Sequence, residues 1–174
     1  MSDQNSKLPP TLTPKLSDDQ IARFDREMSH LLPRYPAENK QAAMLPALHL
    51  MQEMLGYLTT EAMLMVARKL EVSPEKVGEV ATFYAMFRLN PVGKYHVEVC
   101  TNLSCSLRGA EHILERLQSK LGVGLGETTA DGRFSLREVE CLASCGTAPC
   151  LQINEEFFEN LSPGSLDQIL GSLA

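Results

Sequence analysis

Five cysteines, all in the second half of the chain, constrain this sequence more than any other feature. Cys100 and Cys105 are separated by four residues, Cys141 and Cys145 by three, and 35 residues lie between the two pairs. Clustered cysteines in a chain with no export signal favour metal or redox chemistry over structural disulfides. Two close pairs that are far apart in sequence therefore predict a fold in which four thiolates converge on one site.

The spacing of the two pairs leaves the identity of the metal open. A binuclear [2Fe-2S] cluster requires two thiolates on each iron, and two close pairs supply them. A structural zinc ion accepts the same four ligands, although gaps of four and three residues are less usual for zinc than gaps of two. Spacing favours iron–sulfur over zinc and leaves a third kind of site open. A thioredoxin-type dithiol is less favoured because the sequence has no C-x-x-C motif.

The region before the cysteines carries helical patterns. Ser17 and Gln20 have the spacing of a capping box at the start of the first helix. The predicted helices span about residues 17–31, 38–56, 59–70 and 73–88, with Pro46 either kinking the second or opening its latter half. Seven methionines between residues 28 and 86 fit core packing better than a binding surface, because they recur at helical spacing.

The hydrophobic period changes after residues 90–93. Strands are predicted over about 95–99, 134–139 and 151–153, and helices over 108–121 and 165–173. This order predicts a small domain with helices against a sheet. In it Cys100 ends the first strand and Cys105 opens the helix that follows, while Cys141 ends another strand and Cys145 lies in the loop beyond. Loops at strand ends approach one another at one edge of a sheet, so the four thiolates can meet there.

Charge and composition exclude several classes of function. Residues 91–174 hold 6 basic and 11 acidic side chains, out of a net charge of −6 for the whole chain. Nucleic acid and anionic membrane surfaces require clustered Lys and Arg, so neither is expected as a partner. No apolar stretch approaches the roughly 20 residues of a membrane helix. The first 16 residues resemble neither a secretory signal nor a transit peptide, so a polar tail and a soluble, intracellular protein are expected.

Other candidate motifs give no indication of a binding or catalytic site. The glycine-rich segment 122–126 follows a predicted helix and lacks the G-x-G-x-x-G spacing, so a loop is favoured over a phosphate cradle. The four histidines are not paired at metal spacing, which favours surface or structural roles. No Ser-His-Asp or Cys-His arrangement can be argued, so no catalytic residue is assigned.

Two stretches carry a resemblance to a known family: ATFYAMFRLNPVGKYHVEVCTNLSC and ECLASCGTAPCLQINEEFFENLSP. Over roughly residues 17–170 the chain resembles the small iron–sulfur subunit, designated E, of NADH:quinone oxidoreductase (respiratory complex I). The resemblance implies an α+β protein with a flexible tail over 1–16, a helical bundle over 17–90 and a thioredoxin-like [2Fe-2S] ferredoxin domain over 91–174. It implies Cys100, Cys105, Cys141 and Cys145 as cluster ligands and leaves Cys150 as a buried spare thiol.

The same resemblance implies a function as part of a larger NADH dehydrogenase unit. FMN and NADH would be bound by a partner subunit, and the one [2Fe-2S] cluster of this chain would exchange single electrons with that flavin. Further iron–sulfur subunits are expected in the complex, at the cytoplasmic side of a bacterial inner membrane and without membrane insertion. The helical bundle is expected to dock on the partner, and the isolated chain is expected to catalyse nothing. Equivalent subunits of an NAD-linked hydrogenase or formate dehydrogenase, and a structural zinc module, stay open as alternatives.

Overall fold

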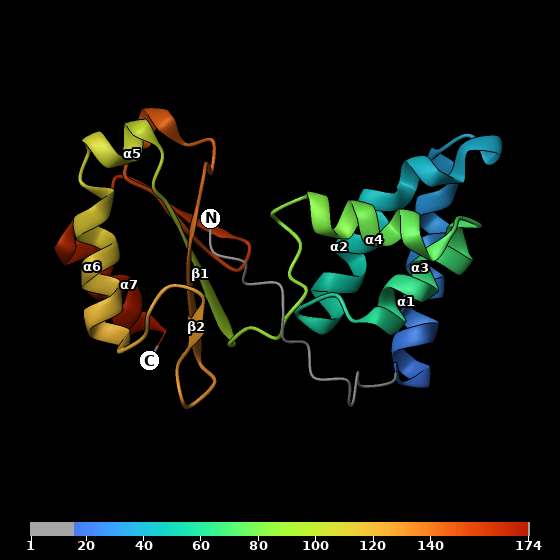
Figure 1. Ribbon diagram of the computed structural model, residues 1–174, viewed down its shortest axis with the longest axis horizontal. Coiled ribbons are helices and arrows are strands. Elements are labelled where there is room, and N and C mark those ends of the chain that lie inside the picture. The colour runs from blue at the N-terminus through green and yellow to red at the C-terminus, as the bar shows by residue number, and fades with distance from the viewer. Residues whose placement is uncertain (1–15, 174) are drawn as a thin grey trace. The chain divides into compact units, whose positions relative to one another are not determined.

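The computed structural model describes residues 16–173 and divides the chain into two compact units at Pro91–Val92 (Figure 1). We call residues 16–91 the helical unit and residues 92–173 the sheet unit. Helices make up the first unit, and a sheet with helices makes up the second. This confirms the predicted α+β class.

The helical unit consists of four α-helices and two short 3-10 helices. They are α1 (Asp18–Leu31), η1 (Leu32–Arg34), η2 (Ala37–Ala43), α2 (Met44–Leu55), α3 (Thr60–Leu70) and α4 (Pro74–Phe83). The capping box predicted for α1 is present: the Ser17 hydroxyl accepts from the Gln20 N–H at 3.2 Å, and the Gln20 side chain accepts from the Ser17 N–H at 2.9 Å. Pro46 lies in the first turn of α2, where a missing N–H costs no helical hydrogen bond.

Side chains from all four helices form one apolar core. Phe24 and Met28 of α1, Leu48 and Met51 of α2 and Val66 of α3 are fully buried in it. The methionines thus serve mainly as core residues, as predicted. The predicted end of the fourth helix near residue 88 was wrong, since α4 stops at Phe83.

Five strands form the sheet of the second unit, in the order β2-β3-β1-β4-β5. The strands are β1 (Tyr95–Cys100), β2 (Glu127–Thr128), β3 (Phe134–Val139), β4 (Leu151–Ile153) and β5 (Glu156–Phe158). The central strand β1 runs parallel to β3, and the other pairs are antiparallel. In register, Cys100 pairs with Val139, so β1 and β3 end at the same edge of the sheet.

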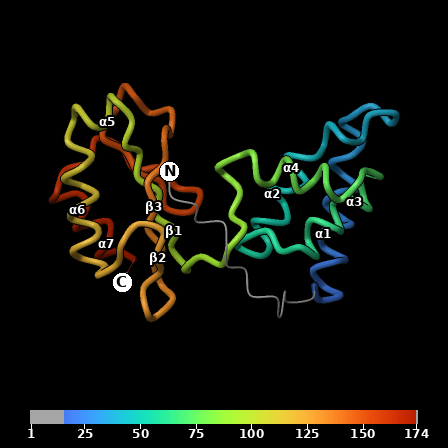
Figure 2. Tube along the Cα trace, in the orientation of Figure 1, coloured from blue at the N-terminus to red at the C-terminus, as the bar shows by residue number. Residues whose placement is uncertain are grey.

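Two helices, α6 (Ala110–Leu121) and α7 (Pro163–Ser172), lie together against the sheet (Figures 1 and 2). Val97 and Val99 of β1 pack with Ile113 and Leu117 of α6 and with Leu166 of α7. Because side chains alternate along a strand, the side chains of alternate β1 residues, including Cys100, face away from this core.

Two details of the sheet unit differ from the sequence prediction. The helix expected over 108–121 is preceded by a separate short helix, α5 (Leu103–Leu107), and Gly109 with φ +90° separates it from α6. Cys105 belongs to α5 and does not open the long helix. The edge strands β2 and β5 were not predicted, because β2 has only two residues and the sequence EFF of β5 does not alternate polar and apolar residues.

Candidate metal centre

Backbone hydrogen bonds bring three cysteine-bearing segments together where β1 ends. The Cys100 N–H donates to the Cys150 carbonyl at 3.2 Å, which joins β1 to the segment that leads into β4. The Thr101 N–H donates to the Val139 carbonyl at 3.2 Å, so the chain that leaves β3 towards Cys141 starts beside Cys100. The parallel pairing of β1 with β3 therefore places Cys100 at the end of β1 and Cys141 just beyond the end of β3 at the same edge. The prediction that Cys141 ends a strand was wrong, since β3 stops at Val139.

The second cysteine of each pair lies on a short helix. Cys105 is in the middle of α5, which starts after Asn102, whose side chain accepts from the Leu103 N–H at 2.7 Å. Cys145 opens η3 (Cys145–Thr147), and η3 packs against α5. All four cysteines predicted as ligands thus belong to segments that meet at one edge of the sheet.

The sulfur atoms are grouped differently from the prediction. The Sγ atoms of Cys105 and Cys150 are 3.8 Å apart, and those of Cys100, Cys105 and Cys150 all lie within 4.8 Å of one another. These three side chains are buried, whereas Cys141 and Cys145 are exposed. The structure therefore groups two of the four predicted ligands with the residue that the sequence left as a spare thiol.

Cys150 was correctly predicted to be buried, but its proximity to the other thiols was missed. The signal that could have shown it is its place immediately before the predicted strand over 151–153. If that strand pairs with β1 in antiparallel register, with Leu151 opposite Val99, the residue just before it, Cys150, comes opposite Cys100.

Two backbone N–H groups approach the sulfur of Cys100. Asn102 and Leu142 donate to it through their amides, and Leu142 directly follows Cys141 in the chain. The Ala143 N–H donates to the Cys141 Sγ at 3.2 Å, and Ala143 takes a left-handed conformation with φ +61°. The loop over 141–144 is therefore turned so that its amides face sulfur atoms, which suits negatively charged sulfur.

The three grouped thiols differ in acidity. Burial favours the neutral thiol of Cys100, but the hydrogen bonds from Asn102 and Leu142 outweigh it and hold its pKa below the usual value. Burial, together with the hydrogen bond to Cys100, raises the pKa of Cys105. Burial and the neighbouring Cys105 raise the pKa of Cys150 to about 12. Cys100 is thus the thiol that ionises first, and binding of a metal ion by the group releases protons.

The chemistry of this donor set fits a soft metal or an iron–sulfur cluster. Thiolates are the ligands that such centres prefer, and no carboxylate or imidazole competes for the position among the residues that the structure describes. The backbone donors around Cys100 and the burial of three sulfurs add the two properties that tune a sulfur-bound centre. The cysteine cluster is able to bind a metal.

Comparison with known proteins agrees with this chemistry. The family described as thioredoxin-like [2Fe-2S] ferredoxin matches residues 28–174. The chain belongs to this family. It is 43% identical to the NADH-quinone oxidoreductase subunit designated E from Rickettsia prowazekii (strain Madrid E) over 152 residues, which cover 84% of this chain and 86% of the relative. It is 41% identical to the corresponding subunit from Mycobacterium tuberculosis (strain ATCC 25618 / H37Rv) over 155 residues, 89% of this chain and 61% of that protein.

These relatives confirm the resemblance to the small iron–sulfur subunit of NADH:quinone oxidoreductase. The fold also occurs in a solved structure of an NAD+-reducing [NiFe]-hydrogenase in the air-oxidized state, with a TM-score of 0.64 over 75% of this chain. That match covers 22% of the hydrogenase chain at 20% identity, so it shows a shared fold. Between residues 16 and 173, no helix has the length and apolar character needed to cross a membrane.

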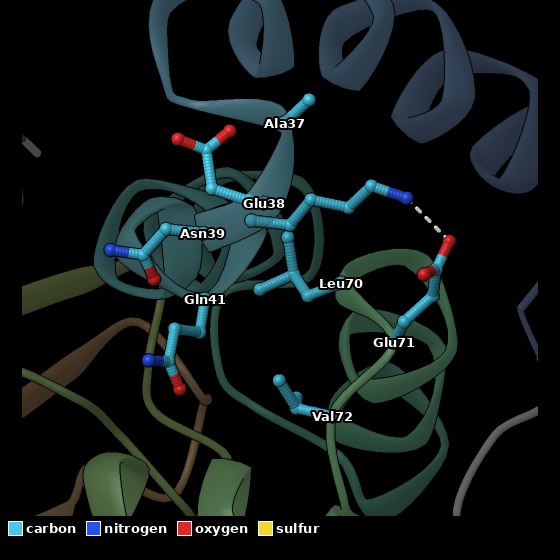
Figure 3. A pocket seen from close by; sticks show the side chains of 8 residues that line it. Ala37, Glu38, Asn39, Gln41, Leu70, Glu71 and Val72 are labelled. Atoms are coloured by element: carbon cyan, nitrogen blue, oxygen red, sulfur yellow. Dashed lines mark hydrogen bonds and ion pairs between the residues drawn. The ribbon is translucent and has the colours of Figure 1, made fainter.

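The helical unit has a hollow of its own (Figure 3). Residues of η2, of the end of α3 and of the connection to α4 line it: Ala37, Glu38, Asn39, Lys40, Gln41, Leu70, Glu71 and Val72. An ion pair between Lys40 and Glu71 spans it. The lining offers neither a thiol nor a histidine, so we assign no metal or catalytic chemistry to it.

Proposed function

We propose that this chain is an electron-transfer subunit that carries one [2Fe-2S] cluster within an NADH dehydrogenase unit of the complex I type. One observation carries the proposal: in a relative of the small iron–sulfur subunit of complex I, the sulfur atoms of Cys100, Cys105 and Cys150 lie within 4.8 Å of one another at one edge of the sheet. When bound, the cluster supplies reversible one-electron transfer. As a subunit of an oxidoreductase, the chain contributes a redox centre and no catalytic side chain.

The proposed cluster ligands are Cys100, Cys105, Cys141 and Cys145. Cys100 and Cys105 are buried and exclude water, whereas Cys141 and Cys145 lie on an exposed loop and on η3. The amides that donate to the Cys100 sulfur stabilise the negative charge that four thiolates and the cluster bring. Cys150 remains outside this ligand set.

The proposal assigns NADH and FMN to a partner subunit. The glycine-rich segment that follows α6 is occupied by local structure: Gly122 caps the helix with φ +66°, and the Gly124 N–H donates to the Glu127 carboxylate at 2.6 Å. A carboxylate at this amide repels a phosphate, which supports a loop and no nucleotide cradle. Hydride transfer from NADH then takes place on the partner, and this chain handles single electrons.

The helical unit is proposed to dock on that partner. Three apolar side chains at and just beyond the end of its fourth helix are exposed: Phe83, which is 80% exposed, Tyr84 and Met86. Phe83 and Tyr84 stack edge to face, with ring centroids 5.1 Å apart. Aromatic and methionine side chains are enriched in the buried part of protein interfaces. We also propose association with further iron–sulfur subunits at the cytoplasmic side of a bacterial inner membrane.

The docking proposal can be tested by co-purification of the full chain with its flavin subunit. Phe83→Ala is expected to weaken recovery of the flavin subunit severalfold, because it removes the most exposed aromatic ring of the patch. Leu64→Ala is the matched control, since Leu64 is also an exposed apolar residue of the helical unit but lies on α3. If wild type and Phe83→Ala recover the same amount of the flavin subunit, the result would count against docking through this patch.

The cluster assignment is tested by metal and acid-labile sulfide analysis of anaerobically purified full-length chain. About two irons and two sulfides per chain are expected for a binuclear cluster. About one zinc and no sulfide, retained when the chain is produced with ample iron, would replace the electron-transfer function with a structural zinc module.

The ligand set is tested by single substitutions in the same assay. Cys141→Ala and Cys145→Ala are expected to lose the cluster, whereas Cys150→Ala keeps it. Loss of the cluster in Cys150→Ala, together with its retention in Cys145→Ala, would overturn the assignment. Copurification with a quinone-linked unit, as opposed to a hydrogenase or formate dehydrogenase, identifies the host complex.

A further inference from the structure

Cys150 lies among thiols that the proposed cluster uses, yet it is not one of the four proposed ligands. We propose that Cys100, Cys105 and Cys150 form a separate three-thiol site that binds one soft metal ion, of the Cu(I) class, in chains that do not carry the cluster. The inference rests on the proposed function in one respect: Cys100 and Cys105 belong to both sites, so the ion and the cluster exclude each other.

The distances between the sulfurs match a single metal ion. At a metal–sulfur distance of about 2.3 Å, three sulfurs placed evenly around one ion lie about 4 Å from one another. In the structure Cys105 and Cys150 are 3.8 Å apart, and every pair among the three sulfurs is within 4.8 Å. Side-chain shifts of a fraction of an ångström are therefore enough to close the three sulfurs on one ion.

The surroundings select a soft ion that accepts three ligands. Cys100, Cys105 and Cys150 are 2%, 1% and 0% exposed, and they pack with Ala110 and Ala148. Such a position offers little access to a water ligand, and in the described part of the chain no histidine or carboxylate joins the group. Zinc almost always takes four ligands, whereas thiolates without a fourth donor favour Cu(I).

The three-thiol site is formed by the fold itself. The Cys100 N–H donates to the Cys150 carbonyl, and Cys105 is held on α5, where the Ser106 N–H donates to the Asn102 carbonyl at 2.8 Å. In the proposed cluster site, by contrast, two of the four ligands, Cys141 and Cys145, are exposed. A soft metal ion thus finds its three ligands already in place, so the cluster-free chain can bind Cu(I) instead of the iron–sulfur cluster.

The test is a competition titration of Cu(I) into full-length chain that has been freed of iron and kept reduced under anaerobic conditions. A Cu(I) chelator of known affinity reports the affinity of the protein, and X-ray absorption reports the number of sulfur ligands. The variants are Cys150→Ala, the closer-sized Cys150→Ser, and the double variant Cys141→Ala with Cys145→Ala. Circular dichroism of each variant verifies that it is folded.

Wild type and the double variant are expected to bind one Cu(I) per chain with three sulfur ligands and similar affinity. Loss of an outer partner of a metal ligand already costs about 10 to 100-fold in affinity, so loss of the Cys150 thiol in either variant is expected to cost at least about 100-fold. Unchanged affinity in both Cys150 variants, or an equal loss in the double variant, would overturn the three-thiol site.

The iron content of the same variants separates this inference from the proposed function. Cys150→Ala is expected to carry as much iron and sulfide as wild type while binding Cu(I) weakly. Absence of an iron–sulfur cluster from the wild-type chain would end the proposed function, and the Cu(I) titration would still decide the three-thiol site.

Discussion

The helical unit and the sheet unit both pack an apolar core, but they differ in how their elements end. In the helical unit large side chains such as Phe24 and Leu48 fill a continuous core. In the sheet unit the core of β1, α6 and α7 stops short of the strand ends, where a separate small cluster contains three cysteines and two alanines. Apolar packing thus stabilises the helical unit throughout. At one end of the sheet unit, buried cysteines take the place of large apolar side chains. The following predictions test this contrast.

The largest expected effect follows from removal of a buried thiol at that end. Cys105→Ala is expected to abolish iron binding and to lower the thermal transition of the sheet unit, because a ligand that binds only the folded state stabilises it. The transition of the helical unit should not move. Iron analysis and calorimetry of the full chain measure both effects.

The matched control for Cys105→Ala is Leu107→Ala, on the same short helix but 78% exposed. It should leave iron content and both transitions unchanged. A fall of both transitions in Cys105→Ala would contradict the separation of the two units.

The next effect concerns the core of the helical unit. Phe24 is fully buried, so Phe24→Ala is expected to lower the free energy of unfolding of this unit by about 3–5 kcal/mol through lost burial and the cavity left behind. Urea denaturation followed by circular dichroism measures it, and the iron content should stay at the wild-type value. With Phe83→Ala, at a site that is 80% exposed, the change should stay within about 0.5 kcal/mol. Comparable losses in the two variants would contradict the assignment of the loss to burial of Phe24.

A smaller effect is expected at the helix starts, where the units can be compared directly. Ser17 caps α1 and Ser162 caps α7, each in a capping box. Ser17→Ala and Ser162→Ala are each expected to cost about 1 kcal/mol. Each loss should appear only in the unit that holds the helix, as read from the two unfolding transitions. A shift of the other transition would show that the units unfold together.

The smallest effect is a pH dependence confined to the sheet unit. Hydrogen bonds from Arg116, and the Lys120 ammonium at 3.1 Å, hold the pKa of Asp167 at about 2, below the ordinary 3.8. A depressed carboxylate pKa stabilises the fold above pH 3.8, and this stabilisation is lost as the pH falls from about 3.8 to about 2. Asp167 is partly exposed to solvent, so the change should be slight. Acid unfolding of wild type and Asp167→Asn measures it, and identical profiles would refute it.

Local signals in the sequence predicted most of the helical unit. Ser17 with Gln20 marked the start of α1, and Gly56, with φ +82°, marked the end of α2. These signals are readable because a cap or a stop is decided by residues within one turn. The end of α4 was missed because the apolar spacing continues through Phe87, which is buried although it lies outside the helix.

The sheet unit was predictable in its class and less so in its site. The resemblance and the pattern both indicated Cys100 and Cys105, and the structure places their sulfurs together. The neighbourhood of Cys150 depends on the pairing of β1 with β4, a contact between residues about fifty positions apart that single-sequence periodicity does not encode. The orientation of Cys141 and Cys145 likewise depends on loop geometry.

Cys100 and Cys141, one from each pair of proposed ligands, lie in different kinds of backbone structure. Cys100 is part of the hydrogen-bonded ladder of β1, whereas Cys141 lies on a loop that contains the left-handed Ala143. If Cys100 holds a cluster, its rigid backbone would keep the reorganisation energy of electron transfer small, because few atoms would move when the charge changes. The loop that carries Cys141 can change sequence without loss of the sheet. Substitutions within residues 141–146 are therefore expected to alter the properties of a bound centre while the fold stays the same.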